Sequence, residues 1–215
     1  IYSPNAAAIE GRLSVFKYRQ NDIFFINNIS EKTINLLACY GHLNIIKWLH
    51  KKNIKGFTKH TINFAAKHGH IEIVKFLHYN RNEGCTIDAM NNAAAIGQLD
   101  IVKFLHENKC EGCTNHAIDW AAFNGHLHII KFLFENRKEG CTLFAFNWAA
   151  MNGHLEVLKF LYDKKFHILK DRWNYIYKKD SKKCIKQLDN IDFSHAIYLA
   201  NEKGHDEVVK YLKNI

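Results

Sequence analysis

Residues 121–133 read AAFNGHLHIIKFL, and residues 149–161 read AAMNGHLEVLKFL, which is nearly the same phrase. Its glycine returns every 28 residues, and histidine follows it in four of the five regular copies, which lie at Gly41, Gly69, Gly97, Gly125 and Gly153. A fixed interval of this length indicates a repeat protein, in which one supersecondary unit is copied and the copies are stacked. We therefore expect the function to lie on a surface that several copies share.

Weaker copies of the unit flank the regular ones, around Gly11, Asp180 and Gly204. They predict about eight units within one domain that spans residues 1–215. Degenerate outer copies suit the ends of a stack, because a terminal unit exposes one broad face to water. The chain has a single proline and no stretch rich in glycine and serine, so the sequence indicates no linker.

The composition is that of a folded chain. Of the 215 residues, 47% are hydrophobic and 24% are charged, which provides enough apolar material for a core and does not suit a disordered segment. A lysine interrupts every apolar phrase, so no apolar run approaches the roughly 18 residues of a membrane span. We expect a soluble monomer without a membrane segment.

The six cysteines do not indicate a disulfide framework. Cys85, Cys113 and Cys141 occupy the same loop position in successive units. Packed helices lie about 8–10 Å apart, beyond the roughly 7 Å limit between the Cα atoms of a disulfide. We therefore expect free thiols and a reducing location, the cytoplasm.

Each unit is predicted to consist of two helices. Thr114 can cap a short first helix, as can the threonines in register with it, and Gly125 then ends that helix in the left-handed conformation. A second helix is predicted over residues 127–135, with its polar residues on one face and its apolar residues buried. At the end of this helix Asn136 and its equivalents are predicted to adopt a positive φ; these equivalents are Asn80 and Asn108.

A pair of alanines lies on each regular first helix except the earliest. The pairs are Ala65-Ala66, Ala93-Ala94, Ala121-Ala122 and Ala149-Ala150. Their small side chains allow the first helices to approach one another closely, whereas the bulkier second helices are held further apart. Wedge-shaped units of this kind predict a curved stack.

The order of threonine, Ala-Ala, two variable residues, Gly-His-Leu and an Ile/Val-rich stretch ending in Lys-Phe-Leu resembles the ankyrin repeat. That resemblance covers nearly the whole chain and implies an all-α solenoid of about eight helix-turn-helix units. The family's usual period is about 33 residues, so the loops between units are expected to be short. This short period and the composition rich in Asn, Lys and Ile resemble ankyrin repeats of large DNA viruses and protists.

The chain departs from the family pattern six residues before each glycine. Where the family has the histidine of a Thr-Pro-Leu-His tetrapeptide, this chain has Asn35, Asn63, Asn91, Asp119, Asn147 and Asn174. The family's histidine hydrogen-bonds to neighbouring loop backbone. We expect the Asn and Asp side chains to do a similar job.

Fourteen histidines raise the question of a metal site. One histidine follows the glycine in most units, namely His42, His70, His126, His154 and His205. Neighbouring histidines of this set lie about 10 Å apart, too far for ligands that each sit about 2.0–2.1 Å from a shared zinc ion. We expect them to bond or pack at the turns between units. Cys110 and Cys113 form an isolated CxxC that the other units lack, and we interpret it as a coincidence.

No phosphate-binding loop, nucleophile elbow or fixed pair of carboxylates emerges from the repeats. The sequence therefore predicts no catalytic residue, no cofactor and no metal ligand, and favours a function other than catalysis.

The net charge of +9 favours one alternative function. Eight lysines at one position of the second helix form a lysine flank, namely Lys17, Lys47, Lys75, Lys103, Lys131, Lys159, Lys186 and Lys210. Such a flank could bind nucleic acid or another polyanion. However, acidic residues three positions earlier can pair with four of these lysines, so a solvated face is the simpler interpretation; they are Glu72, Asp100, Glu156 and Glu207.

The resemblance implies that a protein partner binds the concave surface made by the first helices. Residues that vary between units without harming the packing are the candidates for specificity. They are Tyr40, His60, Phe64, Lys67, His68, Asp88, Asn92, His116, Trp120, Phe123, Phe144, Trp148 and Met151. The aromatic members are either interface hot spots or part of the inner packing, and the sequence leaves both open. We predict a noncatalytic protein-recognition module, an adaptor or scaffold, whose partner the sequence does not identify.

Overall fold

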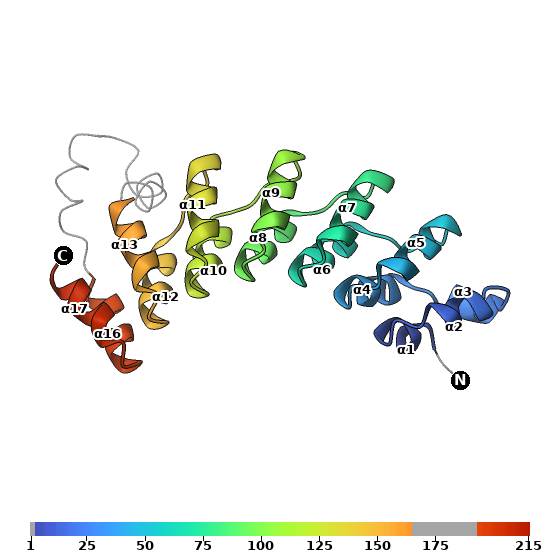
Figure 1. The fold of residues 1–215 in the computed structure, drawn as a ribbon, viewed down its shortest axis with the longest axis horizontal. Coiled ribbons are helices and arrows are strands. Elements are labelled where there is room, and N and C mark those ends of the chain that lie inside the picture. The colour runs from blue at the N-terminus through green and yellow to red at the C-terminus, as the bar shows by residue number, and fades with distance from the viewer. Residues whose placement is uncertain (1–2, 165–192) are drawn as a thin grey trace. The chain divides into compact units, whose positions relative to one another are not determined.

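The computed structural model describes residues 3–164 and 193–215 (Figure 1). Within these residues it contains 15 helices and no strand, which confirms the predicted all-α solenoid. No helix in the described ranges is long and apolar enough to cross a membrane. The unit predicted around Asp180 lies outside the described residues, as do Asn174 and Lys186.

Fourteen of these helices form seven helix-turn-helix pairs. The first helices are α1 (Pro4–Ile9), α4 (Glu31–Cys39), α6 (Lys59–Lys67), α8 (Ile87–Ala95), α10 (His116–Phe123), α12 (Leu143–Met151) and α16 (Ser194–Glu202). The second helices are α2 (Leu13–Tyr18), α5 (Leu43–Lys51), α7 (Ile71–Asn80), α9 (Leu99–Glu107), α11 (Leu127–Asn136), α13 (Leu155–Asp163) and α17 (Asp206–Lys213). The remaining helix, α3 (Ile23–Asn27), follows the first pair and was not predicted.

The chain divides into two compact units. The first comprises residues 1–93 and 100–112, and in it α4 packs against α1, α5 and α6. The second comprises residues 94–99 and 113–215, and in it α12 packs against α10, α13 and α16. Within each unit, first helices therefore pack on first helices, as the alanine pairs predict. The single domain expected over residues 1–215 stays a prediction.

Small residues make this contact between first helices possible. All eight alanines of the predicted pairs are fully buried. The second helices contribute the larger core side chains, such as Ile129, Ile130 and Leu133 of α11. The expectation that every apolar residue of this helix is buried was wrong, because Phe132 and Phe134 are only half-buried at its outer edge.

The repeated glycine ends the first helix as predicted. Gly125 has a φ of 75°, and the amide of the following His126 donates to the carbonyl of Ala121 at 2.8 Å. In this left-handed conformation a side chain would be strained.

The prediction of a positive φ at the asparagines was wrong. The Nδ2 atoms of Asn80, Asn108 and Asn136 donate to the carbonyl four residues earlier at 2.8 Å, so they satisfy the end of the second helix without a left-handed residue. Positive φ instead occurs at Asn53 and Lys109.

Candidate functional site

The first helices are fastened to one another by a ladder of side-chain hydrogen bonds. Oδ1 of Asn63 accepts from the Thr86 amide at 3.0 Å, and its Nδ2 donates to the Thr86 hydroxyl at 2.7 Å. The carboxylate of Asp119 accepts from both the amide and the hydroxyl of Thr142 at 2.8 Å. At Asn63 and Asp119 the bonds confirm the expected binding of neighbouring loop backbone, whereas Asn35 accepts from the side chain of Thr61.

The threonines in this ladder also cap the helices. The hydroxyl of Thr142 accepts from the Phe144 amide at 3.1 Å, and that of Thr86 accepts from the Asp88 amide at 3.2 Å. One side chain thus caps its own helix and binds the preceding unit. This double role fixes the start of each first helix, where several candidate residues lie.

Asp119 is the charged member of the ladder. Its side chain is 1% exposed, and this burial raises the pKa of Asp119, while the bonds from Thr142 act in the opposite direction. The ladder therefore carries an electrostatic cost at Asp119 that an asparagine avoids.

The repeated histidines occupy the turns between units, as predicted. The Nε2 atom of His70 lies 2.8 Å from the carbonyl oxygen of Cys39, and that of His154 lies 3.0 Å from the carbonyl oxygen of Phe123. Because a carbonyl only accepts, Nε2 is the donor in each case. These rings satisfy the C-terminal ends of the preceding first helices, so their role is structural.

The other titratable clusters do not form a metal site. Across residues 3–164 and 193–215, no group of three or more His, Cys, Asp or Glu side chains is placed to hold a metal ion. Five cysteines in these ranges are free thiols, and of the CxxC pair Cys113 is buried while Cys110 is half-buried.

All thirteen candidate recognition residues are exposed or half-buried. In the first compact unit, Tyr40 is 52% exposed. His60, Lys67, His68 and Asp88 are also exposed, whereas Phe64 and Asn92 are half-buried. Burial and the neighbouring Lys67 and His70 lower the pKa of His68. This part of the first-helix face is mainly polar.

In the second compact unit, five of the candidates lie on the packed helices α10 and α12 and form two groups of rings in contact, which we together call the aromatic patch: His116, Trp120, Phe123, Phe144 and Trp148. The rings of Phe144 and Trp148 stack with their centroids 5.2 Å apart, and Phe123 meets Trp148 edge-on at 5.8 Å. His116 stacks on Trp120 at 5.3 Å. Met151, the remaining candidate here, is half-buried on the same helix as Trp148.

Exposure within the aromatic patch indicates whether its residues belong to the inner packing or are available as interface hot spots. Phe144 is 59% exposed and Phe123 is 39% exposed, while both tryptophans are half-buried. The tryptophans thus contribute to the packing and also reach the surface, where the two phenylalanines widen the apolar area.

The lysine flank is largely engaged within the molecule. Lys75 pairs with Glu72 at 3.3 Å and Lys159 pairs with Glu156 at 2.7 Å, as the three-residue spacing predicts. Two further lysines lie over phenyl rings of the following repeat. The Nζ atom of Lys47 lies 5.7 Å from the ring centroid of Phe76, and the Nζ atom of Lys131 lies 5.9 Å from the ring centroid of Phe160. Such contacts stabilise the stack and explain a lysine at this position without a polyanion.

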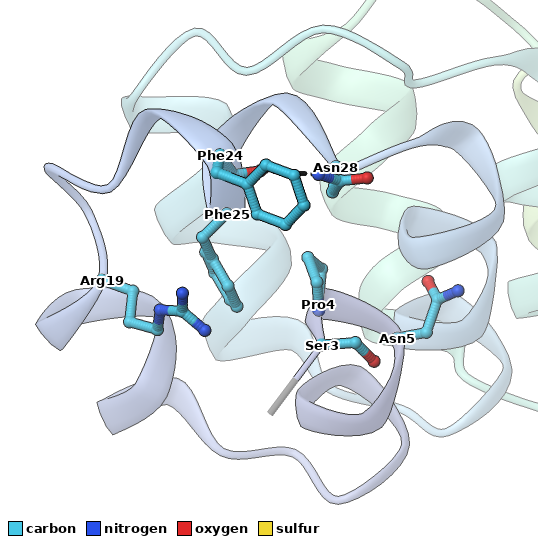
Figure 2. Close-up of a pocket in the computed structure, with 7 residues that line it drawn as sticks. All are labelled: Ser3, Pro4, Asn5, Arg19, Phe24, Phe25 and Asn28. Atoms are coloured by element: carbon cyan, nitrogen blue, oxygen red, sulfur yellow. Dashed lines mark hydrogen bonds between the residues drawn. The ribbon is translucent and has the colours of Figure 1, made fainter. Parts of the chain in front are cut away.

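The unpredicted helix α3 forms an open pocket of about 390 Å³ near the N-terminus. Figure 2 shows Phe24 and Phe25 on one side of it and the start of α1 on the other. The guanidinium of Arg19 lies 4.8 Å from the Phe25 ring centroid and pairs with Asp22, which caps α3. The interval from Gly11 to Gly41, which is longer than 28 residues, was the available sequence signal for this insertion.

Comparisons with known proteins agree with this architecture. The family model described as "Ankyrin repeats (3 copies)" matches residues 62–144 and 90–172, which together cover more than half of the chain. The chain belongs to the ankyrin-repeat family. Ankyrin repeats are generally protein–protein interaction modules.

A solved structure supports the fold. The chain is similar to the crystal structure of the human ASB11 ankyrin repeat domain, with a TM-score of 0.61 and 18% sequence identity. The match covers 76% of this chain and 83% of that one. The comparison with curated protein sequences gave no significant match.

Proposed function

We propose that this protein is a noncatalytic adaptor or scaffold that binds a protein partner through the face made by its first helices. The observation that carries the proposal is the aromatic patch. Aromatic side chains dominate many protein interfaces because they supply a large contact area at a small cost in conformational entropy. In the exposed Phe144 and Phe123, beside two half-buried tryptophans, the chain has such anchors on one face.

The rigidity of the face supports the same proposal. The Thr142–Asp119 bonds fix the start of α12 to α10, and the His154 bond to the Phe123 carbonyl fixes the other end of the same pair. Side chains on these helices are therefore held in place before a partner arrives. Less conformational entropy is lost on binding to such a preorganised surface.

The exposed polar candidates offer a source of specificity for partner binding. His60, Lys67 and Asp88 are exposed on the first-helix face of the first unit. Charged groups in an interface select partners and raise association rates more than they add affinity. We propose that they discriminate among partners that the aromatic patch can bind.

We also propose that the protein acts as a monomer in a reducing compartment, the cytoplasm. The five free thiols among the described residues support that location, because disulfides form and persist in oxidising compartments.

Capture from an extract of the source cells tests the proposal. Wild-type protein should retain a defined protein at both low and high salt, and a variant with Trp120→Ala and Trp148→Ala should lose it. Phe24→Ala is the control, since Phe24 is 76% exposed but lies on α3 and is not one of the candidate recognition residues. Melting curves of all variants establish that each one is folded.

The alternative partner, nucleic acid or another polyanion on the lysine flank, gives a different outcome. Nucleic acid would be recovered, its binding would fall steeply with salt, and a Lys103→Glu, Lys131→Glu variant would lose it. That result would contradict the proposal.

A further inference from the structure

Two cysteines from consecutive repeats line one pocket within the first compact unit. Cys85 lies in the loop between α7 and α8, and Cys110 lies in the loop after α9. Both side chains line the same pocket, although 25 residues separate them in the chain. The arrangement is peculiar to this pair of repeats, because Asn82 and Lys138 stand at the position of Cys110 in the neighbouring units.

A histidine completes the arrangement. The Nδ1 atom of His78 lies 3.9 Å from Sγ of Cys110, within hydrogen-bonding distance for sulfur. The imidazole is itself held edge-on against Phe104, with the ring centroids 5.4 Å apart. Cys110 therefore faces a second thiol and an imidazole.

The thiols border a space that a small molecule can enter. A pocket of about 170 Å³ is lined by His78, Cys85, Cys110 and Glu111, among others. Both cysteines are half-buried, so neither sulfur is sealed in the core. A water molecule occupies about 30 Å³ in the liquid, so the pocket has room for an oxidant as small as hydrogen peroxide.

The two thiols differ in chemical character. The interaction with Cys85 lowers the pKa of Cys110, and the same interaction together with burial raises the pKa of Cys85, so Cys110 is the thiol of the pair that ionises more readily. Only the thiolate is a nucleophile. The pair thus consists of one sulfur prepared for attack and one thiol beside it.

We propose that Cys85 and Cys110 form a peroxide-sensitive dithiol site that closes reversibly to a disulfide joining two consecutive repeats. The Cys110 thiolate attacks one oxygen of the peroxide, the O–O bond breaks, and the products are a sulfenic acid on Cys110 and hydroxide, which takes up a proton to give water. The Cys85 thiol then gives up its proton, and the resulting thiolate attacks the Cys110 sulfur. The S–O bond breaks, the S–S bond forms, and the Cys85 proton leaves with the hydroxyl group as a second water, so the two thiols supply the two electrons that reduce the peroxide.

Reversibility follows from the compartment proposed for the protein. Glutathione and thioredoxin systems reduce exposed disulfides in the cytoplasm, so the bond would persist only while peroxide is present. The neighbouring cysteine provides an internal comparison, since burial raises the pKa of Cys113 to about 11 and keeps it in the unreactive thiol form.

Peptide mapping of the full chain tests the site. The protein is treated with hydrogen peroxide, its remaining thiols are blocked with an alkylating agent, and it is digested without reductant for mass spectrometry. We expect a peptide pair joined through Cys85 and Cys110, which disappears on treatment with dithiothreitol. The pair should be absent from Cys85→Ser and from Cys110→Ser and retained in the control variant Cys113→Ser.

A second measurement detects the sulfenic acid that forms on Cys110 before the disulfide. In Cys85→Ser the sulfenic acid has no partner, so a dimedone-type probe should label Cys110 on the order of tenfold faster than Cys113. Cys85→Thr, whose hydroxyl can also donate a hydrogen bond, serves for the same measurement if the serine variant melts early. Neither readout requires a binding partner.

Three outcomes would overturn the proposal. They are a disulfide between Cys110 and Cys113, equal labelling of Cys110 and Cys113, and the absence of any bond between Cys85 and Cys110 at peroxide levels that oxidise the half-buried Met151 or other thiols of the chain.

Discussion

The imidazole of His154 lies directly against Gly125 of the preceding repeat. A Cβ added to Gly125 would come within 2.6 Å of Nδ1 of that ring, and the backbone there has a φ of 75°. The same relationship holds for Gly11 with His42, Gly41 with His70, Gly97 with His126 and Gly153 with His205. The glycine is therefore needed twice, once for the left-handed turn and once for the ring of the following repeat.

Gly125→Ala is predicted to lower the free energy of unfolding by about 2 kcal/mol, because the new methyl group adds a steric clash to the backbone strain. Gly204→Ala is the matched control, with a φ of 73° but no heavy atom within 4 Å of the added Cβ. It should cost only about 1 kcal/mol. Urea denaturation measures both values, and equal losses would contradict the role assigned to the His154 ring.

Asp119→Asn is predicted to stabilise the protein at neutral pH. The pKa of Asp119 is raised by burial above its ordinary value of 3.8, so the folded chain holds this proton more tightly than the unfolded chain. Stability is thus lost as the pH rises from 3.8 through the folded value, and asparagine avoids that loss. Asn63 already makes the equivalent bonds to Thr86.

Thermal melting of this variant at pH 7 and below pH 4 is the measurement. The advantage of Asp119→Asn should be present at pH 7 and should shrink in acid. Asn63→Asp is the reciprocal control and should be less stable than the wild type at pH 7. A lower melting temperature for Asp119→Asn at pH 7 would contradict the prediction.

His126 is predicted to make the protein sensitive to mild acid. Burial, and to a smaller extent the positive charge of His128, lowers the pKa of His126 from its ordinary value of 6.5. The unfolded chain therefore takes up this proton first, and stability falls as the pH drops from 6.5 toward the folded value.

Melting temperatures between pH 7.5 and pH 5.5 test this sensitivity. His126→Gln should lose less stability over that range than the wild type, since glutamine does not titrate and already occupies this position in one repeat, at Gln98. His60→Gln, at an exposed position, should follow the wild type. If His126→Gln shows the wild-type pH dependence, another group is responsible.

Removing the two tryptophans of the aromatic patch is predicted to weaken partner binding by at least tenfold, about 1.4 kcal/mol, because residues of this type are frequent hot spots. Charge reversal at Lys103 and Lys131 should change the affinity much less. Calorimetry with the captured partner measures both. Equal effects, or a larger effect of the lysine variant, would move the binding surface to the lysine flank.

Periodic features of this protein are predictable from the sequence, and features that interrupt the period are not. Glycine, alanine pairs and threonine recur at fixed positions, and each position has one physical task that identifies it, such as the left-handed turn at Gly125. The positive φ predicted for Asn136 was wrong because its side chain provides a different way to satisfy the same carbonyl groups.

The unpredicted parts depend on contacts between residues far apart in the chain. Helix α3 occupies a stretch without repeat signal, and its pocket forms only where it meets the start of α1. Cys110 shares a pocket with Cys85 of the preceding repeat, which the spacing of the CxxC could not reveal. The first-helix face was predictable as a set of variable positions, but the stacking of Phe144 on Trp148 was not.

The pairing of these glycines with a histidine of a later repeat also bears on how such a chain can change in length. The copies around Gly41, Gly125 and Gly153 each supply both a glycine that a later histidine fits and a histidine that fits an earlier glycine. A 28-residue unit of this kind duplicated in frame therefore recreates the same contact at the new junction. The gene can thus add or remove such whole repeats while this contact is kept.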